Sequence, residues 1–108
     1  MALKLIVALI RDDLSDRVMA AARKAGATGS TIINSARGEG SRPRKTFLGL
    51  DMTTQTDVLL FVVDQSCADA VLAAIDGTAD FDGAHGAGLA FQVDIEKAIG
   101  VFSRGDVP

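Results

Sequence analysis

The chain has 108 residues and a formal net charge of −3 at pH 7, with 48% hydrophobic residues but only five Phe, no Trp and no Tyr. This length predicts a single domain over residues 1–108 with one ordinary core. The acidic balance argues against general nucleic-acid binding. The apolar runs, such as residues 58–63, are far shorter than the ~20 residues of a membrane span.

Cysteine content and hydropathy narrow the class of protein further. The single cysteine, Cys67, excludes an internal disulfide framework and a multi-cysteine zinc site, which favours a cytoplasmic location. The mean hydropathy of +0.27 is high for so small a chain. The apolar residues therefore fill either a well-packed core or a face that is buried against other copies of the chain.

The first third of the chain predicts a strand, a helix and a second strand. Residues 3–10 are apolar almost without interruption, as in a central strand buried on both faces. Apolar side chains then recur at helical spacing, at Leu14, Val18, Ala21, Ala22 and Ala25. Asp13 or Ser15 is expected to cap this helix, and Gly26 to follow its end. The β-branched residues 31–33 predict a short second strand.

A long loop is predicted over residues 37–57. Three glycines and one proline interrupt this segment, and it shows little hydrophobic pattern before Phe47. An extended arm is expected at residues 45–50. Long loops in compact domains are usually functional or disordered, so this segment is a candidate functional element.

The second half of the chain again begins with a strand and a helix. Residues 58–63 are apolar throughout and, with Asp57 before them, predict the third strand over residues 57–63. A helix is expected to start at Ser66, with Asp69 three residues later as in a capping box, and to end at Gly77. The buried face of this helix is predicted at Val71, Leu72 and Ile75.

The last part of the chain predicts a loop, a fourth strand and a helical turn. Residues 79–88 are rich in Gly and Asp. The alternating apolar residues of the fourth strand are Leu89, Phe91 and Val93. Asp94 is expected to cap a final helical turn over residues 95–99, which Gly100 stops. Residues 102–108 are expected to form a flexible tail.

This order of elements is βαββαβ, with a long loop between the second and third strands. It predicts an α+β fold of the ferredoxin-like kind, in which two helices cover one face of a four-stranded antiparallel sheet. The other face of the sheet is then bare, although the first and third strands are apolar on both faces. The economical cover for this face is another copy of the chain.

Several stretches, taken in order, resemble the PII signalling family and its PII-like relatives. Residues 4–10 resemble the first strand of the family, and residues 25–32 resemble its turn from helix to second strand. The stretch Arg37-Gly38-Glu39-Gly40 resembles the step that opens the family's long T-loop. Residues 86–99 resemble the B-loop, the fourth strand and the turn after it. The resemblance spans about residues 3–101, nearly the whole chain.

The resemblance implies a homotrimer whose sheets face inward, with a small-molecule site, usually for an adenine nucleotide, in the cleft between neighbouring subunits. It implies a T-loop at residues 38–56, which docks on a target such as a membrane transporter or an enzyme, and a B-loop at residues 79–88. Arg104 is the only cation after the last turn. The implied effector-binding residues are Thr31, Arg37, Gly38, Gly40, Gly86, Ala87, Gly88 and Arg104.

The chain departs from the nitrogen-regulatory members at the positions that hold phosphates. Ala87 and Leu89 stand where the family has an acidic residue and a lysine, and Gly100 and Phe102 stand where it has two arginines. The tyrosine that enteric members modify cannot exist here, because the chain has no Tyr. These departures favour an effector with fewer phosphates than ATP, such as ADP or AMP, with or without bicarbonate.

The predicted loop also carries a concentration of cations. Arg37, Arg42, Arg44 and Lys45 are interleaved with glycine and proline. Backbone N–H groups and arginine side chains suit a phosphate or a carboxylate, and the same cations could meet an acidic partner protein. The expected partner-binding residues are Arg42, Arg44, Lys45 and Phe47. No aromatic residue alternates with the cations, so a nucleic-acid site is not favoured.

Two other functions stay open at this stage. A trimeric ferredoxin-like protein that handles metal ions would need ligands such as Asp80, Asp82 and His85, although their spacing matches no strong metal motif. A ligand-free adaptor would use the loop alone. No nucleophile is paired with a base anywhere in the sequence, so no catalytic residue, resident metal or cofactor is assigned, and the chain is not expected to be an enzyme.

Overall fold

The computed structural model describes residues 2–34, 46–47, 50–51, 56–81 and 88–100. Two helices, one short 3-10 helix and six strands make up these segments. In chain order they are β1 (Leu3–Arg11), η1 (Asp12–Leu14), α1 (Ser15–Lys24), β2 (Gly29–Ile33), β3 (Thr46–Phe47), β4 (Leu50–Asp51), β5 (Thr56–Asp64), α2 (Gln65–Ala79) and β6 (Leu89–Ile95).

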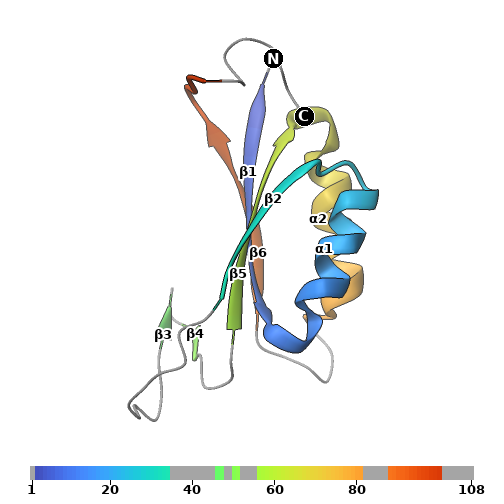
Figure 1. Cartoon of the computed structure of the whole chain (residues 1–108). Helices are drawn as coiled ribbons and strands as arrows, with labels where there is room; N and C mark the ends of the chain where they lie inside the picture. The colour runs from blue at the N-terminus through green and yellow to red at the C-terminus, as the bar shows by residue number, and fades with distance from the viewer. Residues whose placement is uncertain (1, 35–45, 48–49, 52–55, 82–87, 101–108) are drawn as a thin grey trace.

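The main sheet has the strand order β2-β5-β1-β6, and every neighbouring pair is antiparallel. Helices α1 and α2 lie side by side on one face of this sheet (Figure 1). The predicted ferredoxin-like fold is therefore confirmed. Strands β3 and β4 form a separate two-stranded hairpin within the predicted long loop.

The core fills the space between the sheet and the two helices. Along β5 buried and half-buried residues alternate, so that Leu59, Phe61 and Val63 point toward the helices. From the helices, α1 contributes Val18 and Ala22, and α2 contributes residues at helical spacing that include the predicted Val71 and Ile75. The predicted Leu72 is partly buried and packs at the edge of this core.

The start of α1 differs from the expectation. Neither Asp13 nor Ser15 caps it, and Leu14 stands at the N-cap without a side-chain hydrogen bond. Both polar side chains are engaged elsewhere: Asp13 accepts hydrogen bonds from Arg11, and the Ser15 hydroxyl donates to Asp57. The distant partner of Ser15 and the neighbouring partner of Asp13 outcompete the local cap.

The end of α1 agrees with the expectation, because Gly26 follows its C-cap with φ of +128°. The N–H of Gly26 donates to the carbonyl of Arg23 at 3.1 Å, and the N–H of Ala27 donates to that of Ala22 at 3.0 Å. A Cβ atom at Gly26 would lie 2.9 Å from Cys67 Sγ. Both the left-handed backbone and the close approach therefore require glycine here.

Helix α2 starts one residue before the predicted start. Its N-cap is Asp64, which accepts hydrogen bonds from the backbone N–H and the hydroxyl of Ser66 at 2.9 and 2.6 Å. These two bonds hold the pKa of the exposed Asp64 carboxyl below its ordinary value. Their contribution to stability is present above the ordinary pKa and is lost as the pH falls through the lowered one. Asp69 accepts instead from Gln92 of β6.

The predicted end of α2 at Gly77 is wrong. The helix continues to Ala79, and Asp80 closes it with a left-handed backbone at φ 54° and ψ 56°. Within this last turn the Thr78 hydroxyl donates to the carbonyl of Ala74 at 2.9 Å. A single glycine weakens a helix without ending it, so the tertiary packing of Ala79 carries the helix past Gly77.

Replacing Gly77 with alanine is expected to stabilise the protein. Gly77 is exposed in the interior of α2, and a Cβ atom there would meet nothing within 4 Å. The substitution Gly77→Ala should raise the free energy of unfolding by about 0.5–1 kcal/mol, because alanine loses less backbone entropy in a helix. Urea unfolding measures the change. Gly26→Ala should lower the same quantity, and an unchanged or lower value for Gly77→Ala would contradict the prediction.

The predicted helical turn over residues 95–99 is also wrong. Strand β6 runs through Ile95, which pairs with Leu3, and residues 96–99 adopt no regular structure. Asp94 forms an ion pair with Lys4 directly across the strands, so its carboxylate serves the sheet and caps no helix. The expected tail at 102–108 lies outside the described residues. Neither described helix is long and apolar enough to cross a membrane.

Candidate functional site

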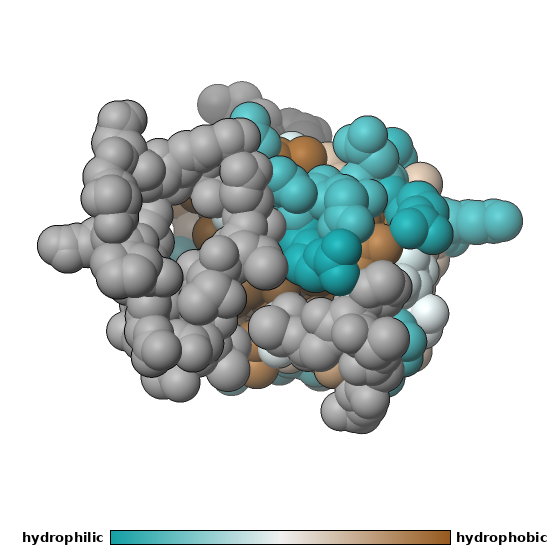
Figure 2. All heavy atoms as spheres, turned by 90° about the horizontal axis from the view of Figure 1, so that it is seen from below, coloured by the Kyte–Doolittle hydropathy of each residue, from teal (hydrophilic) through white to brown (hydrophobic). Residues whose placement is uncertain are grey.

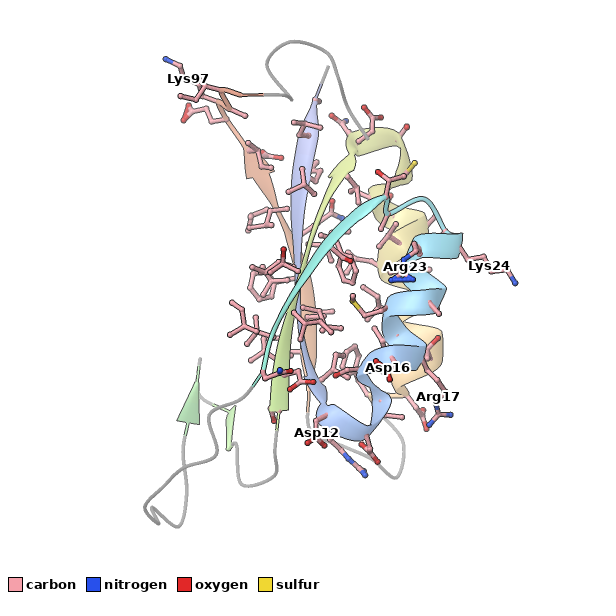
Figure 3. All side chains as sticks on the ribbon, in the orientation of Figure 1. Asp12, Asp16, Arg17, Arg23, Lys24 and Lys97 are labelled. Carbon is pink, nitrogen blue, oxygen red and sulfur yellow. The ribbon has the colours of Figure 1, made fainter. Side chains whose placement is uncertain are left out.

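The sheet face that points away from α1 and α2 is almost entirely apolar. The strand register arranges it in rows across β2, β5, β1 and β6. The three complete rows are Ile33-Val58-Leu9-Leu89, Thr31-Leu60-Val7-Phe91 and Gly29-Val62-Leu5-Val93. Both described helices lie on the opposite face, and side chains made largely of carbon project from this one, on the left in Figure 3. We call these three rows the open face.

Two large side chains of the open face are strongly exposed. Ile33 is 51% exposed and Val93 is 42% exposed. They lie on β2 and β6, the two edge strands of the sheet. The other apolar side chains of the face are half-buried, apart from Leu9, which is only 1% exposed. Exposed apolar groups at both edges of one sheet face are typical of an interaction surface.

The strand ends that flank the two predicted loops lie at the same end of the sheet. Strand β2 ends there at Ile33, and β5 and β6 begin there at Thr56 and Leu89 (Figure 1). The first row of the open face joins all three strands, because Ile33 pairs with Val58 and Leu9 links Val58 to Leu89. Figure 2, which views the molecule from this end, shows hydrophilic residues over one part of it and hydrophobic residues beside them.

The structure describes three of the predicted functional residues. Thr31 is exposed and lies on the open face of β2. Gly88 lies directly before β6, where a Cβ atom would be 2.7 Å from the ring of Phe81 and 3.0 Å from the carbonyl oxygen of Leu9. Phe47 lies in β3. The others, which lie outside the described residues, are Arg37, Gly38, Gly40, Arg42, Arg44, Lys45, Gly86, Ala87 and Arg104.

Thr31 and Gly88 are not brought together within one chain. Thr31 is on β2 and Gly88 adjoins β6, so β5 and β1 lie between them. Three strand spacings separate these edges, about 14 Å at 4.7–4.9 Å each. The residues between them on the open face are apolar. Thr31 and Gly88 of one chain are therefore too far apart for a single small group such as a phosphate to contact both.

Sequence reasoning missed a buried polar pair at the same end of the sheet. The Ser15 hydroxyl donates to Asp57 Oδ2 at 2.7 Å, and the two residues are only 3% and 6% exposed. One signal in the sequence points to Asp57. It stands two residues before Leu59 and four before Phe61, so strand alternation places its carboxylate on the core side.

Two surface hollows lie elsewhere. One of about 540 Å³ is at the opposite end of the sheet, beside the Lys4–Asp94 pair, Gln65 and Glu96. A smaller one of about 310 Å³ is lined by Phe81, by Ala90 and by Leu72, Ala73 and Asp76 of α2. Within the described segments, no three side chains of His, Cys, Asp and Glu gather closely enough to hold a metal ion.

The comparisons with known proteins identify the family. The family model for the nitrogen regulatory protein P-II matches residues 3–104. The chain therefore belongs to the P-II family, as its resemblance to PII proteins predicted. Comparison with curated protein sequences finds no match.

Solved structures place the chain beside PII-like proteins. A candidate PII-like signaling protein from Thermus thermophilus is 28% identical, with a TM-score of 0.62 and 88% of each chain covered. The protein CPII from Thiomonas intermedia, solved with ADP and bicarbonate, is 20% identical, with a TM-score of 0.63 over 88% of this chain and 87% of CPII.

CutA from Xylella fastidiosa shares the fold at lower identity. It is 14% identical, with a TM-score of 0.67 over 94% of this chain and 91% of CutA. The likenesses to CPII and CutA show the fold alone, whereas the family model assigns the chain to P-II.

Proposed function

We propose that the chain forms a homotrimeric PII-like signalling protein of the cytoplasm. It binds a small anionic effector, ADP or AMP with or without bicarbonate, in the cleft between neighbouring subunits. Through residues 38–56 it then regulates a partner, which is a membrane transporter or an enzyme. Residues 79–88 supply the second wall of the cleft.

The observation that carries this proposal is the arrangement of the open face between the two edge strands. Thr31 and Gly88 lie at opposite edges, and the apolar rows between them call for cover by other copies of the chain. Packing several copies face to face buries these rows. It also sets the β2 edge of one copy near the β6 edge of the next, which brings the two halves of the candidate site together.

The nature of the effector is supported by chemistry and by the relatives. Arg37 can donate paired hydrogen bonds to a phosphate, and the glycines at 38, 40, 86 and 88 leave backbone N–H groups accessible. CPII has the same fold and was solved with ADP, AMP and bicarbonate. The lack of the family's B-loop lysine and paired arginines favours ADP or AMP over ATP.

The mechanism we propose is a change in residues 38–56 when the effector binds. An effector shifts such an equilibrium only if it contacts the two loop states unequally. Arg37, Gly38 and Gly40 open this segment, so their contacts differ between the bound and the free state. The segment contains the proposed partner-binding residues Arg42, Arg44, Lys45 and Phe47. A change in its conformation therefore changes its contact with the partner when the effector binds.

Calorimetric titration with AMP, ADP and ATP tests the effector. ADP or AMP is expected to bind more tightly than ATP. Arg37→Ala should weaken ADP about tenfold or more, because a hydrogen bond to a charged group contributes about 1.5–3 kcal/mol. The matched control is Arg23→Ala on the outer surface of α1, labelled in Figure 3, which should leave the affinity unchanged.

The outcomes of this titration separate the candidate functions. If no nucleotide binds at millimolar concentration, the effector assignment fails and a ligand-free adaptor becomes the better description. If ADP binds equally well to Arg37→Ala and to the unmodified protein, the nucleotide is bound without the proposed arginine contact.

A further inference from the structure

The buried pair Ser15–Asp57 links the start of α1 to the start of β5. Ser15 is the first residue of α1, and Asp57 is the second residue of β5. Their side chains meet at 2.7 Å and are nearly withdrawn from solvent. A carboxylate in such a place needs its hydrogen-bond donors, since an unsatisfied buried acceptor is costly.

A second contact stiffens the turn that presents Ser15. Arg11, the last residue of β1, donates to both carboxylate oxygens of Asp13 at 3.1 and 2.7 Å. Arg11 is also the register partner of Thr56, the first residue of β5. The connection from β1 to α1 therefore touches β5 twice, through strand pairing at Thr56 and through Ser15 at Asp57.

Thr56 is where the segment that follows β2 re-enters the main sheet. We propose that Ser15 and Asp57 are a positioning pair, which fixes this re-entry point and thereby sets the affinity of the effector site. The inference rests on the proposed function for its effect on binding, but the effect on the start of β5 stands on the hydrogen bond alone. Neither residue contacts the effector in this account.

The physical reason is the free energy that is needed to order the start of β5 when the effector binds. Residues 38–56 end at Thr56 and contribute to the proposed cleft, so their end must be in place before the effector can bind. If the start of β5 is less ordered in the free protein, ordering it on binding reduces the observed binding free energy. The apparent affinity falls by the fraction of molecules in which the site is competent.

The test compares Ser15→Ala with Val63→Ala by hydrogen exchange and by calorimetry with ADP. Val63 is a core residue at the far end of β5, about 20 Å from Asp57 at ~3.4 Å per residue, so its truncation destabilises the fold without touching the pair. Ser15→Ala should accelerate amide exchange at residues 56–58 and weaken ADP about tenfold. Val63→Ala should accelerate exchange at these amides less than Ser15→Ala does, and it should leave the affinity for ADP unchanged.

A third variant, Ser15→Thr, keeps a hydroxyl at the same place and should recover most of the protection at residues 56–58. The proposal is overturned if these amides exchange equally fast in Ser15→Ala and Val63→Ala, or if Ser15→Ala binds ADP as tightly as the unmodified protein. If the unmodified protein binds no ADP, the proposed function fails, and the exchange comparison alone decides whether the pair positions β5.

Discussion

The substitution Leu60→Glu is expected to convert the proposed trimer into monomers. Leu60 lies in the middle row of the open face, between Thr31 and Val7, while its neighbours Leu59 and Phe61 point into the helix-covered core. In an isolated chain the new carboxylate stays in water. In the assembly it would be buried without a partner, which costs several kcal/mol for each ion even after relaxation, and the cost recurs in every copy.

Sedimentation or light scattering measures this result directly. The variant should have the 11.2 kDa mass of one chain, and the unmodified protein should have three times that mass. The matched control is Ala20→Glu, which places the same side chain on the exposed surface of α1 and should leave the mass unchanged. A Leu60→Glu protein that keeps the trimer mass, or an unmodified protein that is already monomeric, contradicts the assignment of the open face.

The sequence was sufficient to predict the main elements and their arrangement. Periodicity separated the strands from the helices, and the largely apolar character of residues 3–10 and 58–63 on both faces was enough to predict the open face. Such patterns predict structure because they reflect which side of an element is buried. The burial of apolar side chains is what holds the sheet against α1 and α2.

Element ends and polar contacts could not be predicted in the same way. Ser15 resembles a helix cap because the local sequence offers no sign of its partner Asp57, which is 42 residues away. Asp94 resembles a cap for the same reason, although Lys4 holds it in the sheet from 90 residues away. Contacts between distant segments override a local propensity of about 1 kcal/mol.

The candidate site was likewise predictable only in part. The sequence predicted Thr31 and Gly88 as effector-binding residues because they match motifs of the family, but the motifs alone do not place the two on opposite edges of one sheet. Strand order follows from pairing between distant segments, and no local pattern contains it. This topology is what turns two separate motifs into an argument for a site between subunits.

Gly88→Ala is expected to lower the free energy of unfolding by about 1–3 kcal/mol, because it overpacks a site that has no room. The added Cβ would lie 2.7 Å and 2.8 Å from two ring carbons of Phe81 and 3.0 Å from the carbonyl oxygen of Leu9. The ring can move, but Leu9 pairs with Leu89 in the sheet, so any shift of its carbonyl strains the pairing of β1 and β6. Urea unfolding measures the loss.

Gly77→Ala is the matched control, since a Cβ atom at that exposed helix glycine, away from the open face, meets nothing within 4 Å and should cost no stability. A double-mutant cycle with Phe81→Ala then identifies the cause. With the ring removed, the two shortest contacts are gone, so Gly88→Ala should cost less by at least ~0.5 kcal/mol, the lower range of coupling between residues in contact. Strict additivity of the two substitutions would show that Phe81 does not require glycine at position 88. In the proposed trimer the same clash would displace the end of the loop at residues 79–88, so the variant should also bind ADP more weakly than Gly77→Ala does.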